Sequence, residues 1–474
     1  MRFIAASLLL AFVSGANPAQ PPPPFAQRFQ QIRDAATPDE LYRFLWALPK
    51  GGDIHNHHEY SVPPEEWLRL AARGSAKYLV RTGLTPCGPV GADLPQFVTL
   101  RTATVQALPS CVEKDFTPLA TLTPPQRAAW LSALRLDRPG EGRDEFFNRL
   151  VLRTADLEND PALVTDLLVY QLRQAAAENI TYLETQADPR GFVRPDGSPM
   201  PWAESAALFR RRLAQPDAIA TRVATRLQVA VLRFSPTAQQ SLADAFRFVH
   251  QSRDLWVAVN LVGREDIPAG RATRFTASFR DLRRRYPDVR LSLHAGESDR
   301  PGFEVRDTLA LGAERIGHGV NLISDPSTMR RLSGGRTLIE VSLVSNQLLG
   351  YVPDPARHPF PHYLRAGIPV CLNTDDRGAY DSNLTDEYFL ALTHFHLSWP
   401  ELVQLGRDSL KYSFAEPALK SALLARYERN IASFQARFDT PDWRTEIRSI
   451  HPVVSGYAAR FLPLSRHDMI SPRN

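Results

Sequence analysis

Four residues of this 474-residue chain have the types and spacing of a mononuclear metal centre. His55 and His57 are two residues apart, so on an extended strand their imidazoles point to the same side. His294 ends an apolar run and precedes Glu297 by three residues, and Asp375 follows another apolar run. Three imidazoles and one carboxylate suit one Zn²⁺ ion that keeps a position for water, with Glu297 as a nearby proton carrier. The chemistry predicted is metal-assisted hydrolysis.

Eight short apolar runs are each predicted to form a buried strand, and these strands would position the site residues. The predicted strands are 53–57, 180–184, 227–232, 256–262, 289–294, 315–318, 338–341 and 370–373. Amphipathic helical segments such as 161–178, 241–253 and 302–312 lie between them. A repeated βα pattern favours a (β/α)8 TIM barrel of the metal-dependent hydrolase type. A doubly wound open sheet is the alternative, but no glycine-rich phosphate loop follows the first strand.

The unusual polar residues all lie at the ends of predicted strands. His294 ends the fifth strand, His318 ends the sixth, and Asp375 and Asp376 follow the eighth. Each is common by itself, because His-x-His pairs occur in ordinary loops and Asp-Asp pairs in turns or helix caps. In a barrel, however, the carboxyl ends of the strands meet at one mouth, where catalytic groups collect. Their coincidence therefore predicts an active site there.

Four motifs resemble those of the adenosine deaminases of the amidohydrolase superfamily. They are His55-Asn56-His57, His294-Ala295-Gly296-Glu297, Arg315-Ile316-Gly317-His318-Gly319 and Asn373-Thr374-Asp375-Asp376. The secreted branch, the adenosine deaminase-related growth factors or adenosine deaminase 2-like proteins, is the most similar. Its features here include Leu48-Pro49-Lys50-Gly51-Gly52, Leu261-Val262-Gly263-Arg264-Glu265-Asp266 and Ser409-Leu410-Lys411-Tyr412-Ser413. The resemblance covers residues 48 to about 438.

The resemblance implies a complete set of site residues for converting adenosine or 2′-deoxyadenosine to the inosine form and ammonia. The zinc ligands would be His55, His57, His294 and Asp375. The remaining roles would fall to Glu297, which protonates the purine ring, His318, which orients and helps deprotonate the attacking water, Asp376, which hydrogen-bonds the imidazole side of the ring, and Gly263, which lends a backbone N–H. Glu184 would contact the sugar, or else pair with a barrel arginine.

Three residues depart from the family pattern where the sugar should lie. Glu59 follows the first histidine pair at a place where the family has an aspartate, and Arg264 and Arg300 replace residues of other types. The two arginines are either ordinary surface residues or binding groups for a phosphorylated or acidic substrate. The alternative functions are therefore a hydrolase for a different aminopurine and a non-catalytic extracellular binding protein.

Residues 1–16 read as an export signal, since Arg2 precedes a short apolar segment and small residues follow it. A secreted or periplasmic location is therefore expected, with a proline-rich leader and helix over 17–47, the barrel over 48–438 and an extension over 439–474. In that oxidising setting Cys87 and Cys111 are expected to form a disulfide in an insertion over about 80–125, with two free thiols as the alternative.

The partners expected from composition are small molecules. The net charge of +5 is carried by scattered arginines without interleaved aromatic residues, which argues against nucleic acid. No apolar stretch is long enough to span a membrane. The expected partner is a purine nucleoside, and the oligomeric state is not predicted.

Overall fold

The computed structural model describes residues 24–73, 77–194 and 196–465. Eight strands form one parallel sheet in the order β1-β5-β6-β7-β8-β9-β10-β11. They are β1 (Gly51–Asp53), β5 (Ile180–Gln186), β6 (Ala224–Leu232), β7 (Trp256–Val262), β8 (Arg290–Ala295), β9 (Arg315–His318), β10 (Leu338–Val341) and β11 (Val370–Leu372). A bridge between Asn56 and Asp375 joins the ends of β1 and β11, so the sheet nearly closes into the predicted TIM barrel.

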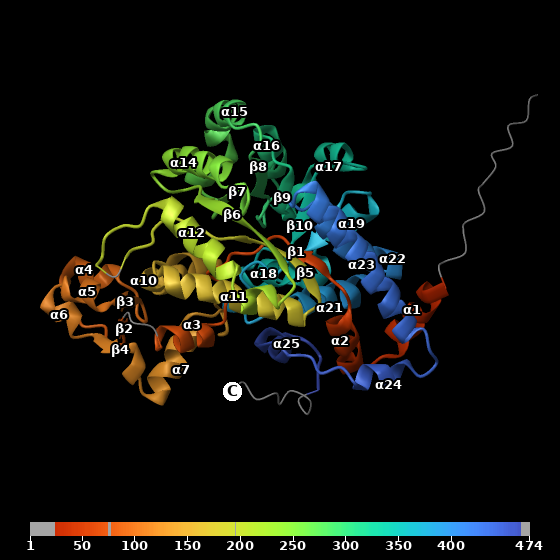
Figure 1. The fold of residues 1–474 in the computed structure, drawn as a ribbon, viewed down its shortest axis with the longest axis horizontal. Helices are drawn as coiled ribbons and strands as arrows, with labels where there is room; N and C mark the ends of the chain where they lie inside the picture. Colours follow the sequence, from red (N-terminus) through yellow and green to blue (C-terminus); the bar gives the residue numbers. More distant parts are fainter. Residues whose placement is uncertain (1–23, 74–76, 195, 466–474) are drawn as a thin grey trace, which may run out of the picture.

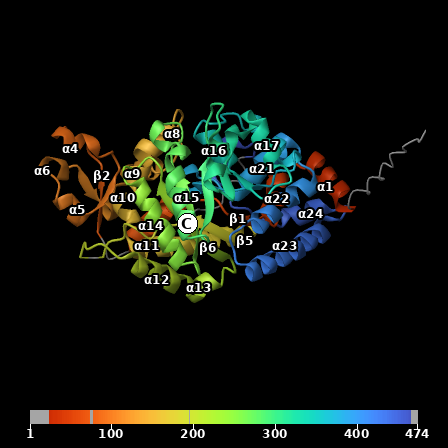
Figure 2. The same ribbon diagram turned by 90° about the horizontal axis from the view of Figure 1, so that it is seen from above.

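Helices alternate with the strands and surround the barrel (Figures 1 and 2). The barrel helices include α11 (Pro161–Ala177), α14 (Ala238–Gln251), α15 (Thr276–Arg285), α16 (Glu304–Leu311), α17 (Pro326–Leu332), α19 (Phe360–Arg365), α21 (Leu384–Phe395), α22 (Trp399–Lys411) and α23 (Pro417–Phe438). Strands covered on both faces read as continuous apolar runs, and every residue of β5 is buried. Because a bridge also joins the ends of the first and last strands, the open-sheet alternative is wrong.

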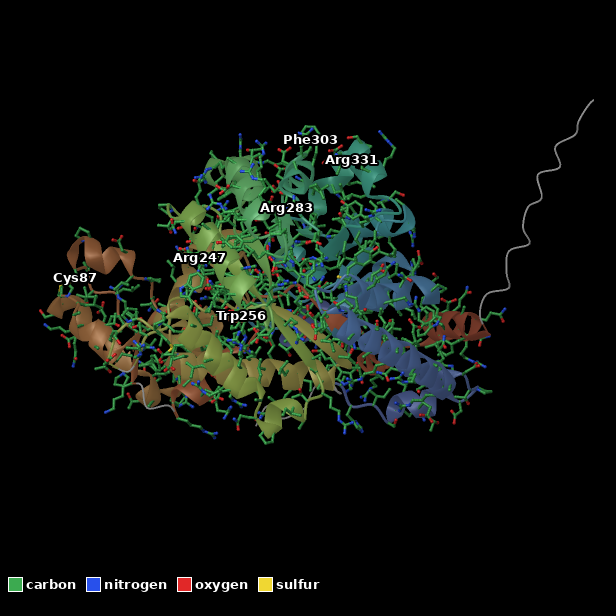
Figure 3. All side chains as sticks on the ribbon, turned by 45° about the horizontal axis from the view of Figure 1, so that its top comes forward. Cys87, Arg247, Trp256, Arg283, Phe303 and Arg331 are labelled. Carbon is green, nitrogen blue, oxygen red and sulfur yellow. A yellow bond between two sulfur atoms is a disulfide. The ribbon has the colours of Figure 1, made fainter. Side chains whose placement is uncertain are left out.

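The side chains follow this layering (Figure 3). Trp256 of β7 is fully buried, and its indole nitrogen donates to the Ala187 carbonyl oxygen at 2.9 Å. Arg247, Arg283 and Arg331, on the outer helices α14, α15 and α17, are exposed. These arginines are therefore solvated surface residues. Among the described residues, no helix has the length and apolar character needed to cross a bilayer.

Segments at both ends of the described chain pack on the barrel helices. The N-terminal helices α1 (Pro24–Ala35) and α2 (Pro38–Ala47) contact α22 and α21, respectively. The C-terminal helix α24 (Trp443–Arg448) contacts α2 and α23, and α25 (Gly456–Phe461) follows it. The predicted export signal at 1–16 lies outside the described residues.

The insertion after β1 is a small unit beside the barrel, at the left of Figure 1. Strands β2 (Tyr78–Arg81), β3 (Thr99–Arg101) and β4 (Phe116–Pro118) form an antiparallel sheet in the order β3-β2-β4. Helices α4 (Gly88–Asp93), α5 (Thr102–Gln106) and α6 (Ser110–Glu113) complete it. Val98, Leu100 and Val105 form a core separate from that of the barrel.

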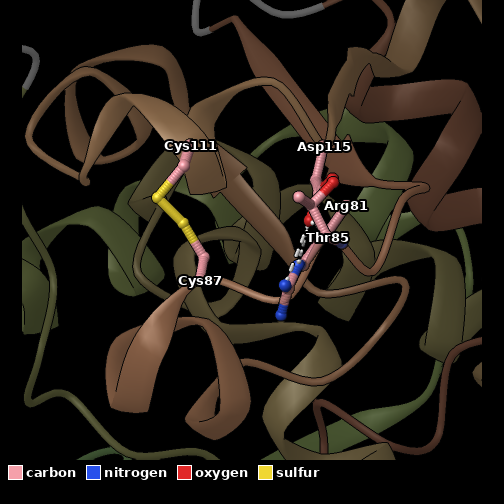
Figure 4. Close-up of a disulfide and its surroundings, with 5 residues drawn as sticks. All are labelled: Arg81, Thr85, Cys87, Cys111 and Asp115. Atoms are coloured by element: carbon pink, nitrogen blue, oxygen red, sulfur yellow. Dashed lines mark hydrogen bonds and ion pairs between the residues drawn. A yellow bond between two sulfur atoms is a disulfide. The ribbon is translucent and has the colours of Figure 1, made fainter.

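A disulfide between Cys87 and Cys111 holds this insertion together, as predicted (Figure 4). The two Cα atoms are 6.1 Å apart, and the bond links the residue before α4 to α6. Beside it, Asp115 accepts hydrogen bonds from the Thr85 hydroxyl at 2.6 Å and from Arg81 Nη2 at 3.1 Å. Cross-links of this kind replace the large apolar core that so short a unit lacks.

Candidate metal centre and active site

The four predicted metal ligands meet at the carboxyl ends of the barrel strands. His55 and His57 follow β1, His294 belongs to β8 and Asp375 follows β11, and their ligand atoms all lie within 4.8 Å of one another. Asp375 Oδ1 is 3.2 Å from His57 Nε2 and 3.6 Å from His55 Nε2. His55 Nε2 and Asp375 Oδ1 are buried without a hydrogen-bond partner among the described residues. Two unpaired buried ligand atoms facing each other fit a divalent cation.

Hydrogen bonds from neighbouring strands orient two of these imidazoles. His55 Nδ1 lies 2.7 Å from Glu340 Oε2, and His294 Nδ1 lies 3.0 Å from Asn260 Oδ1. Both oxygens accept a hydrogen bond from the Nδ1–H group, which leaves the Nε2 lone pairs available to a metal. Burial, and then the neighbouring imidazoles, lowers the pKa of His294 well below its usual range, so that ring is neutral. Glu340 and Asn260 were not identified from the sequence, because their roles depend on pairing between strands.

The backbone around the site adopts conformations that only special positions tolerate. His318 and Asp375 have φ angles of 64° and 51°, in the left-handed region that non-glycine residues rarely occupy. Gly317 lies against His55, where an added Cβ would be 2.5 Å from the imidazole Cε1 atom. Position 317 therefore has to be glycine for the His55 ring to fit.

Glu297 lies beside the ligand cluster as a buried carboxylic acid. Its Oε1 is 3.7 Å from His318 Nε2, and polar side-chain atoms of Glu297, His318 and Asp375 lie within 4.8 Å of one another. Burial, and then the carboxylates of Asp375 and Glu265, raises the pKa of Glu297 well above its usual range. Glu265 also accepts the Glu297 backbone N–H at 2.8 Å, and it pairs with the buried Arg233 at 3.4 Å. The arrangement supplies a protonated, positioned donor.

A chain of hydrogen bonds determines which nitrogen of His318 carries its proton. The Phe360 backbone N–H donates to His358 Nδ1 at 3.2 Å, which leaves His358 Nε2–H to donate to Asn346 Oδ1 at 3.1 Å. Asn346 Nδ2 then donates to His318 Nδ1 at 3.2 Å. Because a backbone N–H can only donate, the proton of neutral His318 sits on Nε2, facing Glu297.

This chain revises one expected role. Burial lowers the pKa of His318 to about 3, so the ring is neutral, and its Nε2–H can donate a hydrogen bond to a reacting oxygen. The geometry supports the expectation that His318 orients the attacking water. It does not support the expectation that the ring accepts the water's proton, since Nε2 is already protonated.

Asp376 and Gly263 also lie at the mouth of the barrel. Asp376 Oδ2 accepts from the Tyr380 hydroxyl at 3.0 Å, and its buried Oδ1 has no hydrogen-bond partner among the described residues. Burial and the neighbouring Asp375 raise the pKa of Asp376 to about 7. Gly263 follows β7 with a φ of 91°. A side chain at that position would approach Phe234 to 2.8 Å.

Glu184 does not join this group, so its expected contact with the sugar is not retained. Its Oε1 pairs with Arg315 at 2.5 Å and accepts from Gln228 at 2.8 Å. Its Oε2 accepts from the Tyr182 hydroxyl at 2.7 Å and the Phe414 backbone N–H at 2.9 Å. The carboxylate is fully buried inside the barrel and saturated by protein donors. Pairing with a barrel arginine, the other interpretation, describes its position.

The two unusual arginines have different surroundings. Arg264 donates to Asp266 at 2.6 and 2.9 Å and to Asp144 at 2.8 Å, so its charge is matched by two carboxylates. Arg300 is exposed. Asp144 belongs to the short helix α8 (Arg143–Glu145), in which Arg143 pairs with Asp299 at 2.8 Å and lies 4.2 Å from the centre of the Tyr351 ring.

We call the α8 residues the strap, because they connect loops that follow three different strands at the mouth. Arg264 follows β7 and Asp299 follows β8, whereas Tyr351 comes after β10. The next residue after the strap, Phe146, packs on Tyr60 at a ring distance of 5.7 Å. The strap therefore lies across the end of the barrel that carries the metal ligands.

Comparison with known proteins shows where the chain belongs. The profile of the adenosine deaminase family matches residues 142–429. The chain is a member of the adenosine deaminase family. It is 30% identical over 254 residues to the adenosine deaminase of Enterococcus faecalis, covering 53% of this chain and 72% of that protein. It is 31% identical over 266 residues to the adenine deaminase of a Chelativorans species, covering 55% and 78%.

A solved structure with the same fold is the N6-mAMP deaminase of Arabidopsis. It has a TM-score of 0.59 and 22% identity, and the match covers 81% of this chain and 99% of that chain. Family membership supports hydrolytic deamination of an aminopurine as the reaction. The related proteins carry the names of base, nucleoside and nucleotide deaminases, so they do not select one substrate.

Proposed function

We propose that this protein is a zinc-dependent deaminase that converts adenosine or 2′-deoxyadenosine to inosine or 2′-deoxyinosine and ammonia. The observation that carries the proposal is the placement of a buried carboxylic acid, Glu297, beside a set of three histidines and one aspartate. Ring protonation and hydrolytic attack need these two features together.

His55, His57, His294 and Asp375 would hold one Zn²⁺ ion. When bound, zinc lowers the pKa of a water molecule from about 15.7 to near 7 and so supplies a nucleophile at neutral pH. The donor set matches zinc, because imidazole nitrogens and one carboxylate are ligands that it accepts. Glu340 and Asn260 would keep His55 and His294 in the tautomer required for binding.

The other residues act on the purine. Glu297 donates its proton to the ring nitrogen next to C6, which makes C6 electrophilic, and the His318 Nε2–H orients the attacking oxygen. Protonated Asp376 donates to the nitrogen on the imidazole side of the base, and the Gly263 backbone N–H meets the remaining edge. The new C6–O bond replaces the C6–N bond. Of the two protons of the attacking water, one restores the proton that Glu297 gave to the ring and the other goes to the amino group, which leaves as ammonia.

A substrate screen with released ammonia as the readout tests the proposal. Zinc-loaded protein should act on adenosine, and Glu297→Gln should lower kcat by about 100-fold or more while the zinc content stays unchanged. Adenine, AMP and methylated adenosines complete the panel. A zinc-replete protein that releases ammonia from none of them would contradict the proposal.

We also propose that the protein is exported and belongs to the secreted adenosine deaminase 2-like branch. The support is the signal-like sequence over 1–16 and the disulfide of the insertion, a cross-link typical of oxidising compartments. In this proposal the barrel covers 48–438 and 439–474 is an extension. Mature protein in the periplasm or medium should begin near residue 17, as read by mass spectrometry. Full-length protein in the cytoplasm would contradict export.

A further inference from the structure

Gln186 is a buried amide at the mouth of the barrel that the mechanism above does not use. It ends β5 and is 2% exposed, and both its Nε2 and Oε1 atoms are buried without a hydrogen-bond partner among the described residues. Its backbone N–H and carbonyl oxygen are each bonded at 2.9 Å, to Asn56 and His58. Only the side-chain amide is unmatched, and buried amides left unpaired are costly and rare.

The strand register places this amide inside the active site. Glu184, two residues earlier on β5, points into the barrel, because it contacts Arg315 of β9 and Gln228 of β6. Side chains two apart on a strand share a face, so Gln186 points the same way, one layer closer to the mouth. Gln186 is also the parallel bridge partner of His57. The backbone of Gln186 therefore lies beside that of His57, one of the predicted metal ligands.

In the proposed reaction, the edges of the base face Gly263 after β7, Glu297 after β8 and Asp376 after β11. The sector over β1, β5 and β6, which lies between β11 and β7 in the strand order, is then left for the substituent that the base carries. Gln186 belongs to this sector, and so does Glu59, which comes two residues after His57.

The charges of this sector disfavour a phosphate. Glu59 and Asp188 are partly buried acidic residues of this sector. Asp188 comes two residues after Gln186 along the chain. The neighbouring cation, Arg190, donates to both oxygens of Asp188 at 2.8 and 2.9 Å. The carboxylates of this sector can accept hydrogen bonds from hydroxyl groups. Because Arg190 is already paired with Asp188, it does not neutralise the negative charge of an added phosphate, which the carboxylates repel.

We propose that Gln186 hydrogen-bonds the sugar hydroxyls of a nucleoside and so makes the enzyme select a neutral sugar over a free base or a nucleotide. This inference rests on the proposed deaminase function and deepens it. The amide offers two donors and one acceptor, which match hydroxyl groups. Substrate binding would satisfy the two atoms that the protein leaves unpaired.

Gln186→Met tests the inference, with Gln228→Met as its matched control. Both glutamines are buried and point into the barrel, but the Gln228 amide is bonded to Glu184 at 2.8 Å. Loss of one or two neutral hydrogen bonds should lower kcat/KM for adenosine about 10-fold in Gln186→Met. The inhibition constant of adenine, which has no sugar, should stay within about 2-fold of that of the wild type.

Thermal stability separates substrate binding from a structural role. Gln186→Met should keep or raise the Tm, because an apolar side chain replaces an amide without protein partners. Gln228→Met should lower the Tm, because it removes one of the four donors that the buried Glu184 carboxylate accepts from. The wild type should also prefer adenosine to AMP by about 100-fold or more.

Three results would count against the inference. It is overturned if Gln186→Met weakens adenosine and adenine equally, if the substitution lowers the Tm as much as Gln228→Met, or if AMP is the preferred substrate. In each case the wild type still deaminates, so the proposed function stands. A zinc-loaded wild type that deaminates no aminopurine overturns both.

Discussion

Replacing Glu340 by glutamine should weaken zinc binding without touching a ligand. The Glu340 carboxylate accepts hydrogen bonds from His55 Nδ1 at 2.7 Å and from the Ser292 hydroxyl at 3.0 Å, and it forms an ion pair with Arg315, whose Nε lies 2.6 Å away. Glutamine has one acceptor oxygen and two N–H donors. Its amide group can face His55 or Arg315 correctly, but not both.

The expected magnitude follows from these contacts. Outer partners of metal-bound histidines are worth about 10- to 100-fold in metal affinity, or about 1.4 to 2.8 kcal/mol. The fold should survive the change, because Arg315 keeps its pairing with Glu184 at 2.5 Å and its contact with the Phe414 ring at 3.9 Å. The loss should therefore appear in zinc affinity rather than in protein yield.

Competition with a chromophoric zinc chelator measures this affinity directly. Glu314→Gln is the matched control, since Glu314 also pairs with an arginine, Arg290, but at the partly exposed start of β8. We expect weaker zinc binding in Glu340→Gln and no change in Glu314→Gln. If zinc affinity in Glu340→Gln stays within about 3-fold of the wild type, the argument that Glu340 orients His55 is refuted.

Three further predictions concern other parts of the molecule. Asn346→Asp should move the proton of His318 from Nε2 to Nδ1, because a carboxylate can accept a hydrogen bond from Nδ1–H but cannot donate one. The ¹⁵N chemical shifts of the ring should report the exchanged tautomer, and kcat should fall about 100-fold. An unchanged tautomer would contradict the proposed chain of hydrogen bonds. Burial raises the pKa of Glu158 to about 7, so the folded state keeps a proton that the unfolded state releases above its ordinary pKa, and stability falls as pH rises through that window. Glu158→Gln should remove this pH dependence and raise the free energy of unfolding by about 2 kcal/mol at pH 8, after allowance for partial exposure. Urea unfolding of both proteins at pH 4.5 and pH 8 measures the effect. If the free energy of unfolding changes equally with pH in the variant and the wild type, the prediction is wrong. Replacing both Cys87 and Cys111 by serine should destabilise the insertion by about 3 kcal/mol, which hydrogen exchange would show as faster exchange there. The chelator assay should find an unchanged zinc affinity. Unaltered exchange in the insertion would contradict a stabilising role for the disulfide.

The barrel could be predicted from the sequence because its strands are buried on both faces. The expected strands at 256–262, 315–318 and 338–341 match β7, β9 and β10 residue for residue. The first strand was placed wrongly at 53–57, whereas β1 covers Gly51–Asp53. The histidines after it lie in an irregular segment with isolated bridges, and alternation along a strand does not describe that segment.

The metal ligands could also be chosen from the sequence, because each lies at or just after the end of a strand and these ends meet at one mouth. The side chains that orient them could not. His358 controls His318 only through Asn346, and Glu340 reaches His55 across the barrel interior. Glu184 was ambiguous, since a strand-end carboxylate can face a substrate or an arginine. Which of these occurs depends on the register between strands.

Charged pairs hold the strap over the mouth of the barrel. The pairs of Arg143 with Asp299 and of Asp144 with Arg264 are partly exposed, whereas the pair of Glu145 with Arg153 at 2.8 Å is largely buried. Partly exposed ion pairs contribute about 0.2 to 1 kcal/mol each, and the cation–π contact with Tyr351 adds about 0.5 to 1 kcal/mol. Added salt should weaken the exposed pairs, so the rates of substrate entry and product release should depend on ionic strength, whereas the chemical step beneath the strap should not.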